Sequence, residues 1–166
     1  MKNKNTVLIG MSGAGKSTLG VLLAKTLGKD FLDTDILIQQ KDGRLLQDII
    51  DADGNDSFLS LEEQVVCSVS ADNTVIATGG SVVYSGAAMS ALSKNATVVY
   101  LHVDYGEIEK RLKNIKGRGI VFKNAGTLRQ VYDERLALYE KYADITLDCT
   151  GRGIEDCVSE LSEVLA

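Results

Sequence analysis

The sequence has no proline, only three cysteines and a single histidine among its 166 residues. Without proline, every loop must take its shape from the 16 glycines and from Asn, Asp and Ser. The cysteines show no C-x-x-C spacing, and their odd number argues against a closed set of disulfides. We therefore expect reduced thiols in a cytoplasmic protein, and no metal bound by cysteine.

Long apolar runs and an excess of positive charge are also missing. No run approaches the length of a membrane span, and the apolar stretch before Gly10 is too short for a signal peptide. The formal net charge of −5 gives no long-range attraction for a nucleic acid backbone. The composition therefore predicts no nucleic acid and no membrane as partner, and it favours a small anionic ligand.

The chain is most simply one domain, long enough to bury about 70% of the surface that its unfolded state exposes. Helical patterns separate five short apolar runs, which we interpret as strands: Thr6–Ile9, Asp30–Leu32, Thr74–Ala77, Thr97–Val103 and Ile145–Leu147. Strands that alternate with helices pair in parallel, because the helices supply the crossovers. The predicted fold class is α/β, a three-layer α/β/α sandwich with a five-stranded parallel sheet.

A glycine-rich stretch, GMSGAGKST from Gly10 to Thr18, follows the first predicted strand. It matches the phosphate-binding loop G-x-x-x-x-G-K-[ST], whose backbone N–H groups surround the phosphates of a nucleotide. We expect Gly13, Ala14, Gly15, Lys16, Ser17 and Thr18 to bind the nucleotide. Lys16 would contact the outer phosphates, and Ser17 would ligate Mg²⁺.

Two carboxylates follow the second predicted strand in the segment FLDTD. In an extended segment Asp33 and Asp35 would point to the same side, at the sheet edge where open α/β folds bind ligands. Asp33 could then face the metal while Asp35 reaches an acceptor hydroxyl. An alternative is that the two residues only cap a helix beginning at Ile36.

Further along the chain, Gly79 and Gly80 allow a ligand to approach the backbone closely after the third predicted strand. Arg118 lies between two glycines, which predicts a mobile positive charge that closes on the γ-phosphate. We interpret His102, on the fourth predicted strand, as structural. The Asp- and Gly-rich segment 41–57 and the basic segment 113–127 have little core character, and we expect both to be flaps.

The order of these motifs along the chain, together with the segment RLALY that contains Arg135 and Tyr139, resembles that of shikimate kinases, which have the nucleoside monophosphate kinase fold. The resemblance implies transfer of the γ-phosphoryl group of ATP to shikimate, with Mg²⁺, in aromatic amino acid biosynthesis. It also implies one domain, 1–166, with a substrate-binding insertion at about 34–61 and a lid at about 113–126. We expect a monomer.

The resemblance also implies roles for individual residues. Asp35 would hold or deprotonate the acceptor hydroxyl, with Lys16 and Arg118 as the other catalytic residues. Asp33 would join Ser17 at the metal. Two arginines, Arg111 and Arg152, would lie near adenine. The acceptor pocket would be formed by Asp35, Leu59, Gly79, Gly80 and Arg135.

Two departures from the family pattern concern the acceptor pocket. The pattern F-R-x-x-E reads FLSLE here, so Leu59 stands where relatives have the arginine that binds the acceptor carboxylate, and Ser81 replaces the third glycine of Gly-Gly-Gly. Loss of one member of a charged pair costs roughly 2–5 kcal/mol in a desolvated site. Shikimate is therefore the first acceptor to consider. The alternatives are a gluconate-type kinase of another hydroxy acid or polyol, and a nucleotide-binding paralogue without catalysis.

Overall fold

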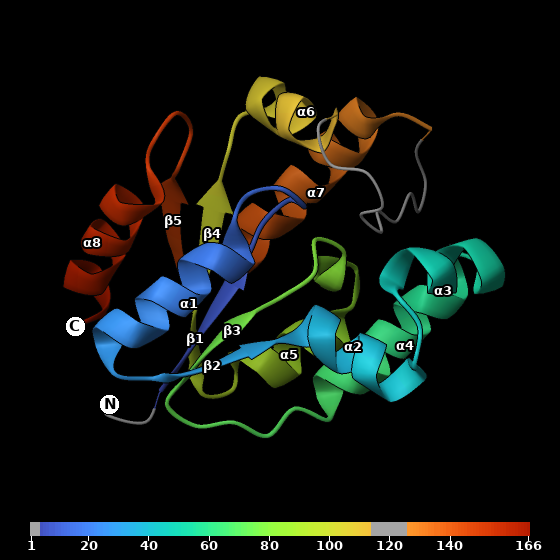
Figure 1. The fold of residues 1–166 in the computed structure, drawn as a ribbon, viewed down its shortest axis with the longest axis horizontal. Helices are drawn as coiled ribbons and strands as arrows, with labels where there is room; N and C mark the ends of the chain where they lie inside the picture. Colours follow the sequence, from blue (N-terminus) through green and yellow to red (C-terminus); the bar gives the residue numbers. More distant parts are fainter. Residues whose placement is uncertain (1–3, 114–125) are drawn as a thin grey trace.

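The computed structural model describes residues 4–113 and 126–166. The described strands form one parallel five-stranded sheet in the order β2-β3-β1-β4-β5 (Figure 1). Their bounds are β1 Asn5–Ile9, β2 Asp30–Asp33, β3 Thr74–Ala77, β4 Ala96–His102 and β5 Ile145–Asp148. The sequence predicted these five strands to within one residue at each end, which confirms the α/β class and the parallel sheet.

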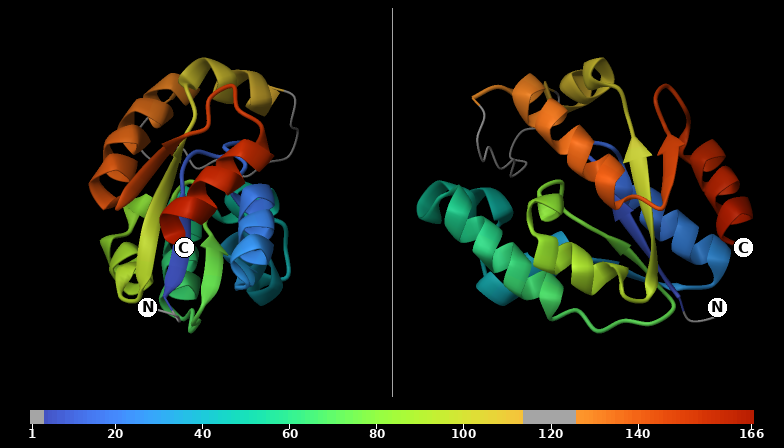
Figure 2. Two further views of the ribbon diagram at one scale, coloured as in Figure 1. Left: turned by 90° about the vertical axis from the view of Figure 1, so that its left-hand side faces the viewer. Right: turned by 180° about the vertical axis from the view of Figure 1, so that it is seen from behind.

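Helices cover both faces of the sheet, as Figure 2 shows in its edge-on left view. Helices α1 (Lys16–Leu27) and α8 (Ile154–Leu165) pack together on one face. On the other face, α5 (Gly86–Ser93) and α7 (Leu128–Tyr142) contact β4. The third layer confirms the α/β/α sandwich. Among the described residues, no helix is long and apolar enough to cross a membrane.

Segment 41–57 is not the flap that its composition predicted. It contains the end of α2 (Thr34–Asp42), all of α3 (Leu46–Asp53) and the start of α4 (Asn55–Cys67). The glycines there end helices, since Gly43 and Gly54 follow α2 and α3 with φ of 89° and 87°, which other residues rarely adopt. The interpretation as a flap was wrong, because these glycines stand at the ends of helices and do not form a loop. Segment 113–126, the predicted lid, lies almost entirely outside the described residues.

The buried apolar side chains form two separate clusters. The larger cluster is built on the sheet and includes Leu8, Ile76 and Leu101. The smaller cluster lies among α2, α3 and α4, which extend to the right in Figure 1, and its buried members are Ile38, Ile49, Phe58 and Val65. Helices α2 to α4 therefore have an apolar core of their own beside the sheet.

Two further short elements complete the described chain. A 3₁₀ turn, η1 (Val82–Tyr84), follows β3, and α6 (Tyr105–Lys113) follows β4. A capping box between Thr127 and Gln130 fixes the start of α7. The loops after β1, β3, β4 and β5 all leave the carboxyl edge of the sheet, where ligands of such folds bind.

Candidate active site

The glycine-rich loop connects β1 to the start of α1, as its sequence predicted. Gly10 is required for space, because a Cβ atom there would lie 2.8 Å from the backbone oxygen of Leu101. Lys16 is buried, and its Nζ donates hydrogen bonds to the carbonyl oxygens of Gly10 at 2.7 Å and Met11 at 2.8 Å. The lysine is therefore held over the loop whose backbone would face the phosphates.

Asp33 and Ser17 meet beside this loop. Oγ of Ser17 donates a 2.6 Å hydrogen bond to Oδ2 of Asp33, while Oδ1 of Asp33 accepts from the backbone N–H of Asp35 at 2.9 Å. Asp33 thus caps α2 and touches Ser17 with its second oxygen. The expectation of an extended Asp33–Asp35 segment was wrong, because α2 begins already at Thr34 and Asp35 lies in its first turn.

A cleft of about 290 Å³ runs from the phosphate loop to the carboxyl end of β3. Lys16, Ser17, Asp35, Gly79 and Gly80 all line it. At its inner end a smaller pocket is lined by Asp35, Gly79 and Gly80 together with Arg135. The fold therefore brings the phosphate-loop residues and four of the five predicted acceptor residues to one cleft.

Arg135 comes from α7 and is only 1% exposed. Its Nε donates to the hydroxyl of Tyr84 at 3.4 Å, and its guanidinium carbon lies 5.3 Å from the centre of that ring. One turn later, the hydroxyl of Tyr139 donates to the carbonyl oxygen of Gly80 at 2.5 Å. A single helix therefore anchors both the buried cation and the backbone of the glycine pair.

Leu59, the fifth predicted acceptor residue, lies next to this pocket rather than in it. It is half-buried on α4, packs against the small apolar cluster and lines a neighbouring cavity of about 280 Å³. Glu62 and Ser81 line both the cavity and the acceptor pocket. Leu59 and Arg135 therefore line different cavities that have Glu62 and Ser81 in common.

Sequence reasoning noted Glu62 and Ser81 but did not foresee that they bind each other. Glu62 is 2% exposed, and its Oε1 accepts a 2.8 Å hydrogen bond from Oγ of Ser81. Burial raises the pKa of Glu62 to about 7. Tyr84 was missed because an isolated tyrosine carries no motif, and Ser12 was not singled out although it lies within the glycine-rich loop. Tyr84 supports Arg135, and Ser12 lines both parts of the cleft.

The nucleotide side contains Arg111, on α6. Its guanidinium donates to the carbonyl oxygen of Gly13 at 2.9 Å and to Glu107 at 2.6 Å. The second oxygen of Glu107 accepts from the backbone N–H of Gly151 at 2.9 Å. Glu107 therefore joins Arg111 to the loop after β5. Arg152 belongs to that loop, but its guanidinium binds Glu160 of α8 at 2.7 Å, away from Arg111's partners.

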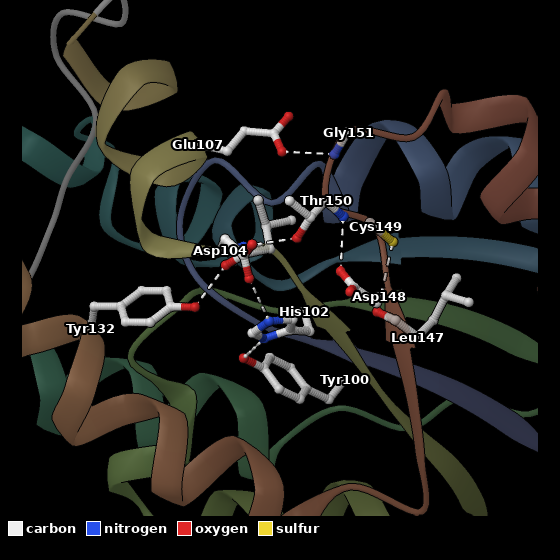
Figure 3. A network of polar contacts seen from close by, with 11 residues as sticks. Tyr100, His102, Asp104, Glu107, Tyr132, Leu147, Asp148, Cys149, Thr150 and Gly151 are labelled. Atoms are coloured by element: carbon white, nitrogen blue, oxygen red, sulfur yellow. Dashed lines mark hydrogen bonds and ion pairs between the residues drawn. The ribbon is translucent and has the colours of Figure 1, made fainter.

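Figure 3 shows the polar contacts that fix this side of the sheet. His102 contacts Tyr100 at 3.0 Å through Nδ1 and Asp104 at 3.1 Å through Nε2, and the backbone N–H of Asp104 donates to Thr150. The side chain of His102 thus bridges Tyr100 and Asp104 at the end of β4, and the backbone N–H of Asp104 makes the contact to the loop after β5. Arg118 lies outside the described residues.

A phosphate loop that shares one cleft with an acidic residue and a buried arginine suits a P-loop kinase of small alcohols. In phosphoryl transfer the loop holds the nucleotide, a carboxylate orients the accepting hydroxyl, and a cation binds the rest of the acceptor. The described residues bring one group suited to each of these tasks, namely the phosphate loop, Asp35 and Arg135, to the cleft and its smaller pocket.

Comparison with known proteins defines the family. The family model described as "Shikimate kinase" matches residues 12–166. The chain is 36% identical over 155 residues to the shikimate kinase of Bacillus cytotoxicus, covering 93% of each chain. It is 34% identical over 161 residues to that of Bacillus anthracis, covering 96% of this chain and 97% of the relative.

A solved structure agrees with these relatives. The shikimate kinase of Acinetobacter baumannii, in complex with shikimate, matches with a TM-score of 0.86 and 29% identity, covering 98% of this chain and 92% of the other. The chain belongs to the shikimate kinase family and is an ATP-dependent kinase that phosphorylates an alcohol group.

Proposed function

We propose that this protein transfers the γ-phosphoryl group of ATP to the 3-hydroxyl of shikimate. The observation that carries the proposal is that Asp35 and Arg135 line one small pocket, which opens into the cleft beside the phosphate loop. This arrangement offers a hydroxyl-binding group and a carboxylate-binding group in the lining of one pocket. Family membership and the shikimate-bound Acinetobacter baumannii structure support the same acceptor.

On the nucleotide side, residues 13–18 would bind the phosphates of ATP, with Lys16 against the transferred group. Arg111 and Arg152 would flank the base, and Arg118 would close over the γ-phosphate. Ser17 and Asp33 would hold a divalent metal, since a hydroxyl and a carboxylate oxygen meet beside the phosphate loop and hard cations prefer oxygen ligands. When bound, Mg²⁺ would neutralise charge that builds up on the phosphates.

On the acceptor side, Asp35 would orient the hydroxyl and accept its proton as the new P–O bond forms. Gly79 and Gly80 would let the ring lie against the backbone. Arg135 would pair with the acceptor carboxylate, and its burial would make that charged pair strong. Leu59 would line the neighbouring cavity and would bring no charge to the acceptor.

We further propose a monomer in the cytoplasm. The free cysteines are consistent with a reducing compartment, because Cys149 and Cys157 are both buried as thiols. Sedimentation of the purified protein tests the monomer directly.

The function is tested by a coupled assay of ADP release with shikimate and with gluconate, using the wild-type protein and Asp35→Asn. We expect turnover with shikimate and a loss of at least about 100-fold in kcat for Asp35→Asn, the size of a lost general base. Asp51→Asn, at an exposed position on α3, is the matched control and should be unaffected. Turnover with gluconate and none with shikimate would contradict the proposal.

A further inference from the structure

The carboxylate of Glu107 contacts two parts of the nucleotide side at once. Its Oε1 accepts from Nη2 of Arg111 at 2.6 Å, and its Oε2 accepts from the backbone N–H of Gly151 at 2.9 Å, the contact drawn in Figure 3. Through Nη1, Arg111 also donates to the carbonyl oxygen of Gly13 at 2.9 Å. Glu107 therefore connects α6, the phosphate loop and the loop after β5.

The order of the strands places these contacts opposite the acceptor. The cleft that contains Asp35 runs from the phosphate loop to the end of β3, on one side of β1. Glu107 and Gly151 follow β4 and β5, on the other side of β1. Because the γ-phosphate must face the acceptor, the base of ATP must leave the phosphate loop on the side of β4 and β5.

The loop after β5 is held in place and still leaves room for a ligand. The backbone N–H of Thr150 donates to Oδ1 of Asp148 at 3.0 Å, and Oγ1 of Thr150 accepts from the backbone N–H of Asp104 at 2.9 Å. Gly151 follows with φ of 67°, and a Cβ atom there would meet nothing within 4 Å in the part of the chain that the structure describes. A flat ring can therefore approach this turn closely.

Both contacts of Glu107 depend on its charge. The hydrogen bond from the backbone N–H of Gly151, together with that from Arg111, lowers the pKa of Glu107 from its ordinary value, so the group is ionised at neutral pH. An ionised carboxylate has two accepting oxygens and can hold both donors at once, whereas an amide has only one such oxygen.

We propose that Glu107 is a positioning residue for the base of ATP. It holds Arg111 and the backbone of Gly151 in one fixed arrangement, and this arrangement binds the base end of the nucleotide rather than its phosphates. The inference rests on the proposed function and deepens it, since Arg111 is the residue proposed to flank the base. The phosphate loop keeps its own hydrogen bonds from Lys16 when Glu107 is lost.

Calorimetric titrations with ATP and with inorganic tripolyphosphate, each with Mg²⁺, separate the base from the phosphates. Glu107→Ala should weaken ATP binding about tenfold, at the lower end for a charged hydrogen bond because the side chains of Glu107 and Arg111 are 27% and 31% exposed. Tripolyphosphate has no base, so its affinity should change by less than about twofold. In steady-state assays KM for ATP should rise with little change in kcat.

A matched control and a second variant complete the test. Glu109→Ala removes the same charge from the same helix, where Glu109 binds Tyr105 and Lys113, and should leave both affinities unchanged. Glu107→Gln keeps the volume of the side chain and serves if Glu107→Ala does not fold. Its amide oxygen can hold only one of the two donors, so ATP affinity should fall at least about threefold.

The outcomes separate this inference from the proposed acceptor. Unchanged ATP affinity in a folded Glu107 variant would overturn the inference. An equal loss for ATP and tripolyphosphate would also overturn it, because Glu107 would then support the phosphate loop instead of the base. Wild-type protein that binds ATP without phosphorylating shikimate would overturn the proposed acceptor alone, since neither titration needs an acceptor.

Discussion

Leu59→Arg introduces the arginine that the family pattern F-R-x-x-E implies at this position, and the structure defines what the new side chain would meet. Leu59 lines a cavity of about 280 Å³, which has room for a longer side chain. Three carboxylate residues, Asp56, Glu62 and Glu63, line the same cavity, and none of its lining residues is basic. A guanidinium there would therefore find anionic partners, and it would lie beside Glu62 and Ser81, which also line the acceptor pocket.

Two opposing contributions set the size of the effect. A charged hydrogen bond to the acceptor carboxylate is worth about 1–3 kcal/mol, or about 5- to 150-fold in KM for shikimate. Against this, the half-buried leucine gives up apolar contacts with the small cluster around Phe58, at a cost of about 1 kcal/mol in folding stability. We expect tighter shikimate binding together with a melting temperature a few degrees lower.

The assay is steady-state kinetics with shikimate at saturating ATP, combined with thermal melting. Ser57→Arg adds the same charge to an exposed position of the same helix and should leave KM unchanged. The reasoning is refuted if the folded Leu59→Arg protein has the same KM as a wild type that already binds shikimate tightly. Leu59 would then lie outside the carboxylate site.

Three further predictions follow from contacts in the cleft. Lys16→Met should abolish turnover without unfolding the protein, because the hydrogen bonds of Lys16 to the Gly10 and Met11 carbonyls tie it to the phosphate loop and it belongs to neither apolar cluster; turnover assays with circular dichroism check this, and unchanged turnover would contradict it. Gly79→Ala places a methyl group between Asp35 and Glu62 and should lower kcat/KM for shikimate at least about 100-fold, while Gly106→Ala, where nothing lies within 4 Å of the added atom, should not. The free energy of unfolding of Glu62→Gln, relative to that of the wild type, should rise by on the order of 3 kcal/mol between pH 5 and pH 8, because the raised pKa makes ionisation of Glu62 unfavourable in the folded state. Urea titrations of both proteins at both pH values measure this difference. The same difference in unfolding free energy at pH 5 and pH 8 would exclude the effect.

The sheet and the phosphate loop could be predicted from the sequence because both are encoded locally. Each strand is a short apolar run, and the loop is a contiguous motif that the strand and helix around it support. Segment 41–57 could not be predicted in this way. Its polar composition is that of a loop, yet α3 forms there because Ile49 can be buried against Phe58 of the next helix.

The acceptor pocket shows a second limit of sequence reasoning. Asp35, Gly79, Gly80 and Arg135 were found one by one, from short motifs and from the family resemblance. The Ser81–Glu62 hydrogen bond joins residues 19 positions apart on different elements. A sequence marks each of them as unusual but carries no signal that pairs them, since the pairing depends on how α4 packs against η1, which begins directly after Ser81.

The separate apolar cluster of α2 to α4 has a consequence for how this protein can evolve. Leu59 and Glu62 belong to helices that draw their packing from Ile38, Ile49, Phe58 and Val65, whereas the phosphate loop is supported by the cluster on the sheet. Substitutions on α2 to α4 that reshape this part of the acceptor side therefore strain the smaller cluster rather than the core that supports the phosphate loop. New acceptor preferences can therefore arise through substitutions in helices α2 to α4, while the phosphate loop that binds ATP is kept.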